Sequence, residues 1–165
     1  MSELISPTEV KYFISCLFNS EDFTLERSQE LAATLIGPHK SFHPQFNPLK
    51  DYYSQEMGHS LERVIFYSDQ LKKRDELVDR KLQATLIENK YSRDNKRLIN
   101  LDVGYIAKEQ VLLATGKPYA HRIFLGEGVF AELTYFFQNK SFQSLPWTYP
   151  DYKHQEKIEF FNQIR

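Results

Sequence analysis

The segment from His121 to Phe137 constrains the fold more than any other part of the chain, because its pattern is that of a β-hairpin. Two apolar runs, His121–Leu125 (HRIFL) and Val129–Phe137 (VFAELTYFF), flank Gly126-Glu127-Gly128. Side chains of the second run alternate between two faces, and Glu132 is the only charged residue in it. Alternation with a period of two beside a glycine-rich turn predicts two paired antiparallel strands.

Further strands and helices are expected in the rest of the chain. Short runs rich in β-branched and aromatic residues predict strands, whereas apolar residues three and four positions apart predict helices. The expected strands are Val10–Leu17, Arg63–Ser68, Arg97–Leu101 and Gln110–Thr115. The expected helices are Thr24–Ile36, Asp75–Asn89 and a short one after Pro150 that carries Ile158, Phe161 and Ile164.

The two longer helices have recognisable ends and faces. Thr24 or Asp22 is expected to cap the first helix, and Gly37 with Pro38 ends it. Its inner face is expected to contain Leu31, Ala32, Leu35 and Ile36. The inner face of the second helix is expected to contain Val78, Leu82 and Leu86.

Two stretches between these elements are less regular. Pro38 to Pro48 carries three prolines, which predicts irregular structure or the edge of a sheet. Tyr52–His59 (YYSQEMGH) fits neither a strand nor a helix clearly.

The order of these elements predicts the fold class. Strand, helix, weak strand, strand, helix, strand is the order of the split βαβ arrangement in ferredoxin-like domains. We therefore expect a single α+β domain over residues 1–165, with a ferredoxin-like sheet, an extra C-terminal β-hairpin and a short C-terminal helix. Another α+β arrangement of the same elements remains open.

Charge and cysteine content limit the functions to consider. A formal net charge of −1 lacks the basic excess of a dedicated nucleic-acid binder, and the basic run Lys90–Arg97 is better explained as a solvated helix end and loop. Cys16 is the only cysteine, which excludes an intramolecular disulfide and fits a buried strand. The N-terminus lacks the pattern of a signal peptide, and no apolar run is long enough to cross a bilayer. A cytoplasmic location without membrane contact is expected.

Several well-defined motifs are missing from the sequence. The Lys40-Ser41 pair lacks the glycines of a phosphate-binding loop, which makes a GTPase of the usual kind very improbable. No dinucleotide-binding glycine motif follows a strand, and no nucleophile elbow is present. His39 and His43 have a spacing that would suit metal ligands on a helix, but Pro38 and Pro44 make a helix there improbable. No metal site and no particular cofactor are therefore predicted.

The segment Asn100-Leu101-Asp102-Val103-Gly104-Tyr105 is the first of three polar segments that stand out. Aspartate and glycine at the end of a strand are typical of an Asx-type turn, which is the simpler interpretation. The alternative is that Asp102 and Tyr105 contact a ligand.

The second segment is the start of the hairpin, where His121 and Arg122 face Glu132 on the other arm. With the turn at Gly126 to Gly128, residues whose numbers sum to about 254 lie opposite each other, which pairs Arg122 with Glu132. The pair can be a simple cross-strand ion pair. Alternatively, the three side chains form a charged wall for an anionic ligand, with His121 titrating near neutral pH.

The third segment is Trp147-Thr148-Tyr149-Pro150-Asp151-Tyr152, which holds the only tryptophan. The favoured interpretation is a C-terminal strap whose aromatic residues cover the sheet, with Asp151 capping the last helix. A stacking platform for a base or a sugar is the functional alternative.

These segments together resemble one family. Tyr52-Tyr53-Ser54-Gln55-Glu56-Met57-Gly58, the Asn100–Tyr105 segment, Leu113-Ala114-Thr115-x-Lys117, His121-Arg122-Ile123 and the Trp147–Tyr152 segment are similar to the bacterial domain-of-unknown-function family 4416. The chain departs from the family pattern at Val103, where proline is usual, and at Gly116, where threonine is usual. The resemblance implies no established activity, although some members are labelled GTP-binding.

Two functional hypotheses follow. In the first, the protein binds or processes a small anionic or nucleotide-like ligand in a polar, aromatic pocket, with Asp102, His121 and Glu132 as catalytic candidates. The ligand-binding candidates are Tyr53, Glu56, Tyr105, Arg122, Trp147, Tyr149 and Asp151. In the second, the exposed aromatic residues form the contact surface of a non-catalytic interaction or scaffold module. The sequence favours the first hypothesis slightly and indicates neither a reaction nor an oligomeric state.

Overall fold

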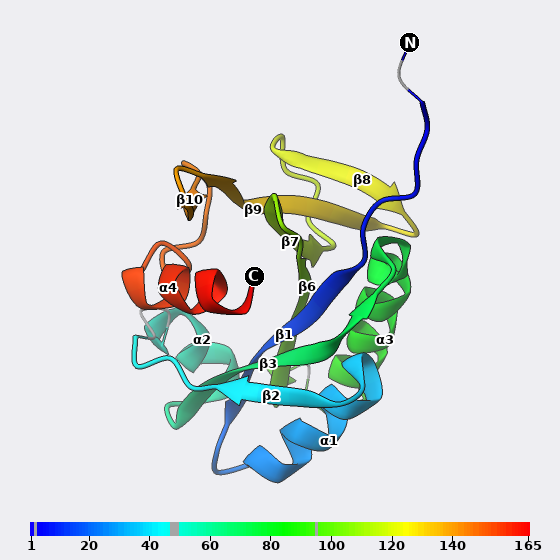
Figure 1. The fold of residues 1–165 in the computed structure, drawn as a ribbon. Coiled ribbons are helices and arrows are strands. Elements are labelled where there is room, and N and C mark those ends of the chain that lie inside the picture. Colours follow the sequence, from blue (N-terminus) through cyan, green and yellow to red (C-terminus); the bar gives the residue numbers. More distant parts are fainter. Residues whose placement is uncertain (2, 47–49, 95) are drawn as a thin grey trace.

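The predicted strands assemble around one large antiparallel sheet (Figure 1). The computed structural model describes residues 1, 3–46, 50–94 and 96–165. Within these ranges the helices are α1 (Leu25–Ile36), α2 (Lys50–Met57), α3 (Leu77–Lys90), preceded by the 3-10 turn η1 (Arg74–Glu76), and α4 (Gln155–Ile164). The strands are β1 (Val10–Asn19), β2 (His39–Phe42), β3 (Leu61–Lys72), β4 (Ser92–Arg93), β5 (Lys96–Arg97), β6 (Ile99–Ile106), β7 (Gln110–Thr115), β8 (Arg122–Gly126), β9 (Val129–Gln138) and β10 (Ser141–Ser144).

Across the sheet the strand order is β10-β9-β7-β6-β1-β3-β2, and β8 also pairs with β9. Neighbouring strands are antiparallel throughout these pairings. β4 and β5 form a separate two-stranded ribbon. The chain is therefore a mixed α/β domain with four α-helices in its described residues.

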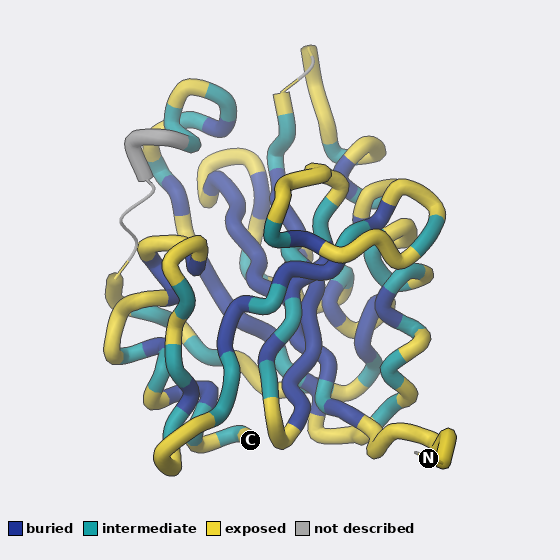
Figure 2. The backbone as a smooth tube through the Cα atoms, turned by 90° about the horizontal axis from the view of Figure 1, so that it is seen from above, coloured by how far each residue is buried: buried dark blue, intermediate teal, exposed yellow. Residues whose placement is uncertain are grey.

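The two faces of the sheet are covered differently. Helices α1 and α3 pack on one face, where Tyr12, Ile14, Cys16 and Phe18 of β1 enter a single apolar core. On the opposite face α4 packs over a core that contains Phe13. Helix α2 packs there over a smaller cluster that contains Leu17. Figure 2 shows the buried segments in the centre of the fold and the exposed ones around it.

The predicted hairpin is present with the predicted pairing. β8 and β9 are joined at Glu127 and Gly128, which both have positive φ, and Arg122 lies opposite Glu132. Positive φ at both central residues is the geometry of a type I′ turn. Asn139 and Lys140, between β9 and β10, also both have positive φ. β10 was not predicted from the sequence.

Three predictions about local structure need correction. The Asn100–Tyr105 segment is not a turn, because β6 continues to Ile106 and pairs with β1 along this length. The inner face of α3 does not contain Leu82 and Leu86, which are exposed, and carries Leu77, Ala84 and the polar Glu88 instead. Asp151 does not cap the last helix, because α4 begins after His154 and Asp151 is buried.

Other predictions agree with the structure. Thr24 caps α1, accepting a hydrogen bond from the backbone N–H of Arg27, and Gly37 ends the helix with a positive φ. His39 lies in β2 at the edge of the sheet rather than in a helix. The segment that fitted no single element forms α2. Pro48 lies outside the described residues.

One irregularity of the sheet positions the candidate site. β6 runs from Ile99, but it pairs with β7 only over Gly104–Ile106. β7 continues to Thr115 along β9 alone. The first half of β6 and the end of β7 therefore lie apart, without backbone pairing between them.

Candidate functional site

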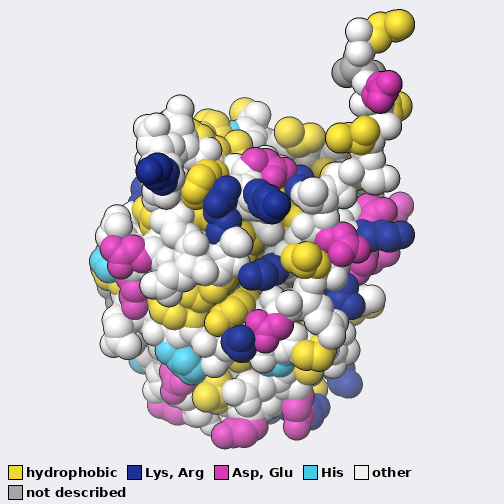
Figure 3. Space-filling model, in the orientation of Figure 1, with side chains coloured by type: hydrophobic (Ala, Val, Ile, Leu, Met, Phe, Trp, Pro, Cys, Tyr) yellow, Lys and Arg dark blue, Asp and Glu magenta, His cyan; other side chains and the backbone are white. Residues whose placement is uncertain are grey.

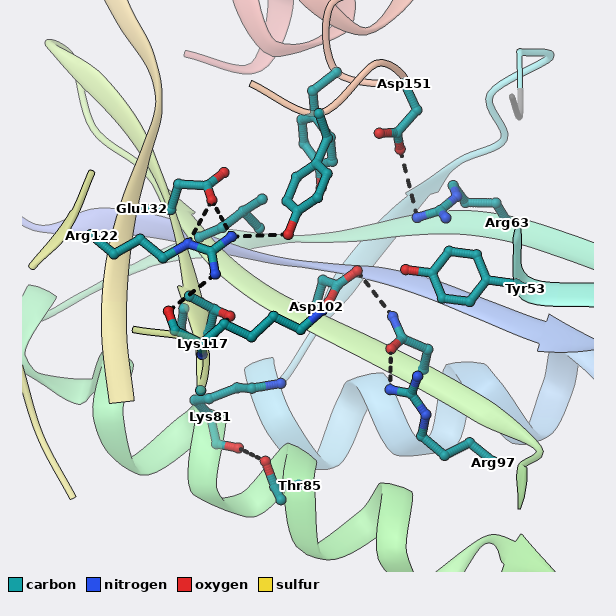
Figure 4. A pocket seen from close by; sticks show the side chains of 17 residues that line it. Tyr53, Arg63, Lys81, Thr85, Arg97, Asp102, Lys117, Arg122, Glu132 and Asp151 are labelled. Carbon is teal, nitrogen blue, oxygen red and sulfur yellow. Dashed lines mark hydrogen bonds and ion pairs between the residues drawn. The ribbon is translucent and has the colours of Figure 1, made fainter. Parts of the chain in front are cut away.

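A polar cavity of about 310 Å³ lies between these separated strand ends (Figure 4). Its walls come from α2, β3, α3, β5, β6, β7 with the connection that follows it, the β8–β9 hairpin and the segment before α4. The lining residues are Tyr53, Arg63, Lys81, Thr85, Arg97, Asn100, Asp102, Leu113, Ala114, Thr115, Gly116, Lys117, Arg122, Glu132, Tyr149, Asp151 and Tyr152. In Figure 4, Arg122, Glu132 and Lys117 lie across this space from Arg63 and Tyr53.

The cavity interrupts the face of the sheet that α2 and α4 cover. On β1, Ser15 separates Phe13 from Leu17, and Asp102 of β6 lies opposite Ser15. Alternation along the strands places Arg63 of β3 on this face as well, and its Nη1 donates to the Ser15 hydroxyl at 2.9 Å. A row of polar residues thus divides the apolar cores under the two helices.

The best-connected pair of the site is Arg122 with Glu132. Arg122 Nε and Nη2 both donate to Glu132 Oε2, at 2.8 and 2.6 Å. Further donations from Arg122 reach the Tyr149 hydroxyl at 3.0 Å and the Lys117 carbonyl at 3.1 Å. Both charged side chains are at least 98% buried, at 2% and 1% exposure. The pair therefore fixes the hairpin, the β7 end and the C-terminal segment to one another.

Glu132 Oε1, the second oxygen of the same carboxylate, is buried without a hydrogen-bond partner among the described residues. Oε2 takes the Arg122 donors and also lies 3.3 Å from His121 Nε2. Because a buried carboxylate oxygen normally accepts a hydrogen bond, Oε1 is an unsatisfied acceptor on a residue of the cavity lining.

A second buried charge cluster lies under α4. Lys157 Nζ donates to Asp151 Oδ2 at 2.6 Å, and Arg63 Nη1 lies 3.8 Å from the same oxygen. Burial lowers the pKa of the Lys157 ammonium to about 8, while the adjacent Asp151 carboxylate raises it in part. Asp151 thus reaches the cavity with its charge already shared by two cations.

Opposite this cluster, a hydrogen-bonded chain connects α2 to β6. Arg97 donates to both Glu56 oxygens at 2.7 and 2.9 Å and to Asn100 Oδ1 at 2.7 Å. Asn100 in turn donates to Asp102 Oδ2 at 3.0 Å. The Arg97 hydrogen bonds lower the pKa of the Glu56 carboxyl. Burial and the nearby Asp102 raise the pKa of the Tyr53 phenol to about 12.

Helix α3 supplies the hydrogen bonds that β6 lacks from β7. Glu88 Oε1 accepts from the Leu101 N–H at 2.6 Å, and Lys81 Nζ donates to the Leu101 carbonyl at 3.3 Å. Burial raises the pKa of the Glu88 carboxyl. Lys81 forms no ion pair within 4 Å of a carboxylate among the described residues, although its charge acts on the nearby Glu88 carboxyl and lowers the pKa of that group in part.

Cations outnumber carboxylates around the cavity. Five basic side chains line it (Arg63, Lys81, Arg97, Lys117 and Arg122) against three acidic ones (Asp102, Glu132 and Asp151). Within the part of the chain that the structure describes, the Lys117 ammonium has no hydrogen-bond or ion-pair partner. On the molecular face in Figure 3, by contrast, basic and acidic side chains are interspersed. The cavity is thus cationic in a chain whose net charge is −1.

Comparison with known protein families adds one finding. A model of the family described as Domain of unknown function (DUF4416) matches residues 8–165. The chain belongs to this family. The DUF4416 match covers every helix and strand described above and agrees with the resemblance seen in the sequence. Searches of the curated proteins and of the solved structures gave no significant match.

Six of the residues singled out in the sequence of this DUF4416 chain lie together at the cavity. They are Tyr53, Asp102, Arg122, Glu132, Tyr149 and Asp151. His121 and Trp147 are outside the lining and stack on each other with ring centroids 5.1 Å apart. Glu56 lies behind Arg97.

Tyr105 is separated from this group. It packs edge-to-face on Tyr12, with centroids 6.0 Å apart, in the core under α1 and α3. Since alternate residues of β6 point to opposite faces, Asp102 and Tyr105 cannot share one side of the sheet. We therefore leave Tyr105 out of the candidate site.

The sequence interpretation of this DUF4416 chain missed five basic residues, namely Arg63, Lys81, Arg97, Lys117 and Lys157. Arg63 stands inside a run of buried apolar residues, and Lys157 occupies the inner face of α4 with Phe160 and Phe161. A basic residue at a position whose periodicity demands burial is a usable signal. Lys81 and Lys117 carry no such signal, since solvent-facing lysines look the same in a sequence.

Two further findings concern metal and membrane sites. Among the described residues, no group of three or more His, Cys, Asp and Glu side chains could hold a metal ion. No helix in the same residues is both long and apolar enough to cross a membrane.

Proposed function

We propose that this protein binds a small anionic ligand in the cavity, with Lys117 as the principal contact. The observation that carries the proposal is the Lys117 ammonium, which has no hydrogen-bond or ion-pair partner among the described residues, in a lining that also contains Lys81 and Arg63. A cationic cleft with low-dielectric walls attracts anions. The volume of about 310 Å³ is at the lower end for small-molecule sites, which favours a compact metabolite.

Arg122 has a different role from the one expected from the sequence. Four of its donor contacts are already used by Glu132, Tyr149 and Lys117. We assign it to shaping the site, and we assign direct contact with the anion to Lys117, Lys81 and Arg63. Tyr53 and Tyr149 are the aromatic residues in the lining that can pack against the rest of the ligand.

Asp102, Glu132 and His121 stay the acid–base candidates if the ligand is also turned over. Asp102 and Glu132 contribute carboxylates to the lining, and His121 lies at the rim beside Glu132. Turnover of a bound ligand that stops in Asp102→Asn, with binding retained, would assign a catalytic role to this carboxylate.

Thermal melts and titration calorimetry with sugar phosphates, organic acids and nucleotides test the proposal. A ligand at about 100 times its dissociation constant should add roughly 2.7 kcal/mol to the free energy of unfolding. Lys117→Ala should weaken binding about tenfold or more, because it removes a charge-assisted contact, and should leave the ligand-free stability unchanged. Lys108→Ala is the matched control, since Lys108 is an exposed lysine in the β6–β7 connection, at the opposite end of β7 from Lys117.

Arg122→Ala is a poor test, because it leaves the buried Glu132 charge without compensation and costs about 3–5 kcal/mol of stability. A flat screen, or ligand affinities equal in Lys117→Ala and wild type, would refute the assignment.

The alternative function, a non-catalytic interaction or scaffold module, is favoured by one separate observation. Ile123, Phe124 and Leu125 are 71%, 60% and 43% exposed on β8, which among the described strands pairs only with β9. An extended segment of a protein partner can pair with such an edge. Partner capture that is lost in Phe124→Asp and kept in Lys117→Ala would support this alternative.

The order of four other strands of the sheet supports a finer fold assignment. The order β6-β1-β3-β2, with α1 between β1 and β2 and α3 between β3 and β6, supports a ferredoxin-like split βαβ core with the remaining strands added at β6. The single cysteine, Cys16, is free and buried, which supports a reducing, cytoplasmic location.

A further inference from the structure

The open acceptor on Glu132 indicates the chemistry of the ligand beyond its negative charge. Glu132 Oε1 is buried, has no hydrogen-bond partner among the described residues and belongs to a residue of the cavity lining. Leaving a buried acceptor unpaired costs about 1–3 kcal/mol, and more for a charged group. Since Oε1 is already shielded from water in the ligand-free protein, a ligand whose donor reaches it would remove this cost, and a complementary ligand therefore carries a donor.

The donor required is neutral rather than cationic. Oε2 of the same carboxylate already receives two hydrogen bonds from Arg122, at 2.8 and 2.6 Å, so the charge of Glu132 is compensated. The lining carries five cations against three carboxylates. An ammonium group on the ligand would add to this excess, whereas a hydroxyl donates to Oε1 without bringing a charge.

An unpaired donor on the opposite side of the cavity can be satisfied by the same ligand. Arg63 Nε is buried without an acceptor among the described residues, and Arg63 also lines the cavity. A hydroxyl oxygen accepts as well as donates, but an ammonium group only donates. Hydroxyl and anion oxygens of one ligand can therefore satisfy both Glu132 Oε1 and Arg63 Nε.

We infer that the ligand is a hydroxylated anion, a compact polyol phosphate or hydroxy acid, whose hydroxyl donates to Glu132 Oε1 while its anionic group contacts Lys117. This inference rests on the proposed anion-binding function and adds the second recognition element. Glu132 thereby selects among anions that Lys117 alone would accept.

Three phosphate monoesters of nearly equal size test the inference in an NMR titration of the whole protein: ethyl phosphate, 2-hydroxyethyl phosphate and 2-aminoethyl phosphate. They differ only in whether the terminal carbon carries hydrogen, a hydroxyl group or an ammonium group. We expect the hydroxyl compound to bind about tenfold tighter than the ethyl compound and the amino compound to bind weakest. Propionate and 3-hydroxypropionate form a second pair, and whichever pair binds identifies the anion as phosphate or carboxylate.

The double variant Arg122→Met/Glu132→Leu tests whether Glu132 causes the preference for the hydroxyl compound. Replacing a buried ion pair by apolar residues of similar volume usually preserves folding, whereas removing one partner does not. In this variant the affinity ratio of the hydroxyl to the ethyl compound should fall to about one.

The outcomes separate the two proposals. Equal affinities for the hydroxyl and ethyl compounds, or tightest binding of the amino compound, would overturn the hydroxyl inference while leaving anion binding intact. A ratio that stays unchanged in the double variant would overturn the role of Glu132. No binding of any probe would overturn anion binding, and the inference with it.

Discussion

The two faces of the central sheet use the same strands for different purposes. Along β1, Ile14 and its neighbours on one face enter an unbroken apolar core under α1 and α3. On the other face Phe13 and Leu17 belong to separate clusters, and Ser15 lies between them at the polar row that borders the cavity. We therefore expect the first face to contribute more to stability, whereas on the second face polar side chains interrupt the apolar core beside the cavity.

The largest expected effect tests this division directly on β1. Ile14→Ala, in the continuous core, should lower the free energy of unfolding by about 2–5 kcal/mol, because it leaves a cavity that cannot fully collapse. Ser15→Ala, one residue further, should cost about 1 kcal/mol through its hydrogen bond to Arg63. Urea unfolding measures the loss in the free energy of unfolding for both variants. Similar losses would contradict the expected difference between the two faces of the sheet.

Gly104 is expected to give the next largest effect. A Cβ at this position would lie 2.4 Å from the Leu112 carbonyl oxygen and 2.6 Å from the ring of Phe13. Gly104→Ala should therefore destabilise the domain by roughly 1–3 kcal/mol through overpacking. Gly116→Ala, where a Cβ meets no atom within 4 Å, is the control and should be close to neutral by thermal unfolding.

A pH-dependent effect is expected from Lys157, on the cavity-bearing face. Burial lowers the pKa of its ammonium to about 8, against 10.5 for an ordinary lysine. Between these values the native protein releases a proton that the unfolded chain retains, so the free energy of unfolding should rise with pH. Relative to Lys157→Met, the wild type should gain on the order of 1–3 kcal/mol between about pH 8 and pH 10.

Urea titrations of both proteins across this range measure the difference. A difference that stays flat or falls as pH rises would contradict the assigned pKa direction.

The smallest expected effect concerns Glu56 and Arg97 at the outer wall of the cavity. Both side chains are 34% exposed, and their contact lowers the pKa of Glu56. The stabilisation should be present above the ordinary carboxyl pKa and be lost as pH falls through the lowered one. Glu56→Gln should cost less than about 1 kcal/mol at neutral pH, because solvent screens the pair. A loss of more than about 1 kcal/mol in chemical denaturation would contradict this expectation and show that the domain depends on the Glu56–Arg97 contact for its stability.

Local sequence patterns predicted the features that depend only on residues close together in the chain. The hairpin turn, the opposition of Arg122 and Glu132, and the Thr24 cap depend on neighbours in the chain, and they are confirmed. Six of the predicted site residues line the cavity: five come from the three polar segments, and Tyr53 comes from the Tyr52–Gly58 run of the family resemblance.

Helix α3 shows why the remainder could not be predicted. Apolar periodicity favoured Leu82 and Leu86 as its buried face, yet both are exposed. Lys81 and Glu88 face the sheet instead, since the Leu101 backbone needs a donor and an acceptor there. That need arises from the early end of the β6–β7 pairing, which no local pattern near residue 80 records.

Side chains of α3, rather than a neighbouring strand, form hydrogen bonds with the Leu101 backbone on the cavity side of β6. This arrangement has a consequence for amide hydrogen exchange. Most amides of the sheet are protected by carbonyls of a neighbouring strand, but the Leu101 amide is protected by the carboxylate of Glu88 alone. Its exchange with deuterium should therefore follow the undocking of α3 and the protonation of Glu88, rather than the opening of the whole sheet. A single amide signal would then report how firmly the helical wall of the cavity is held in place.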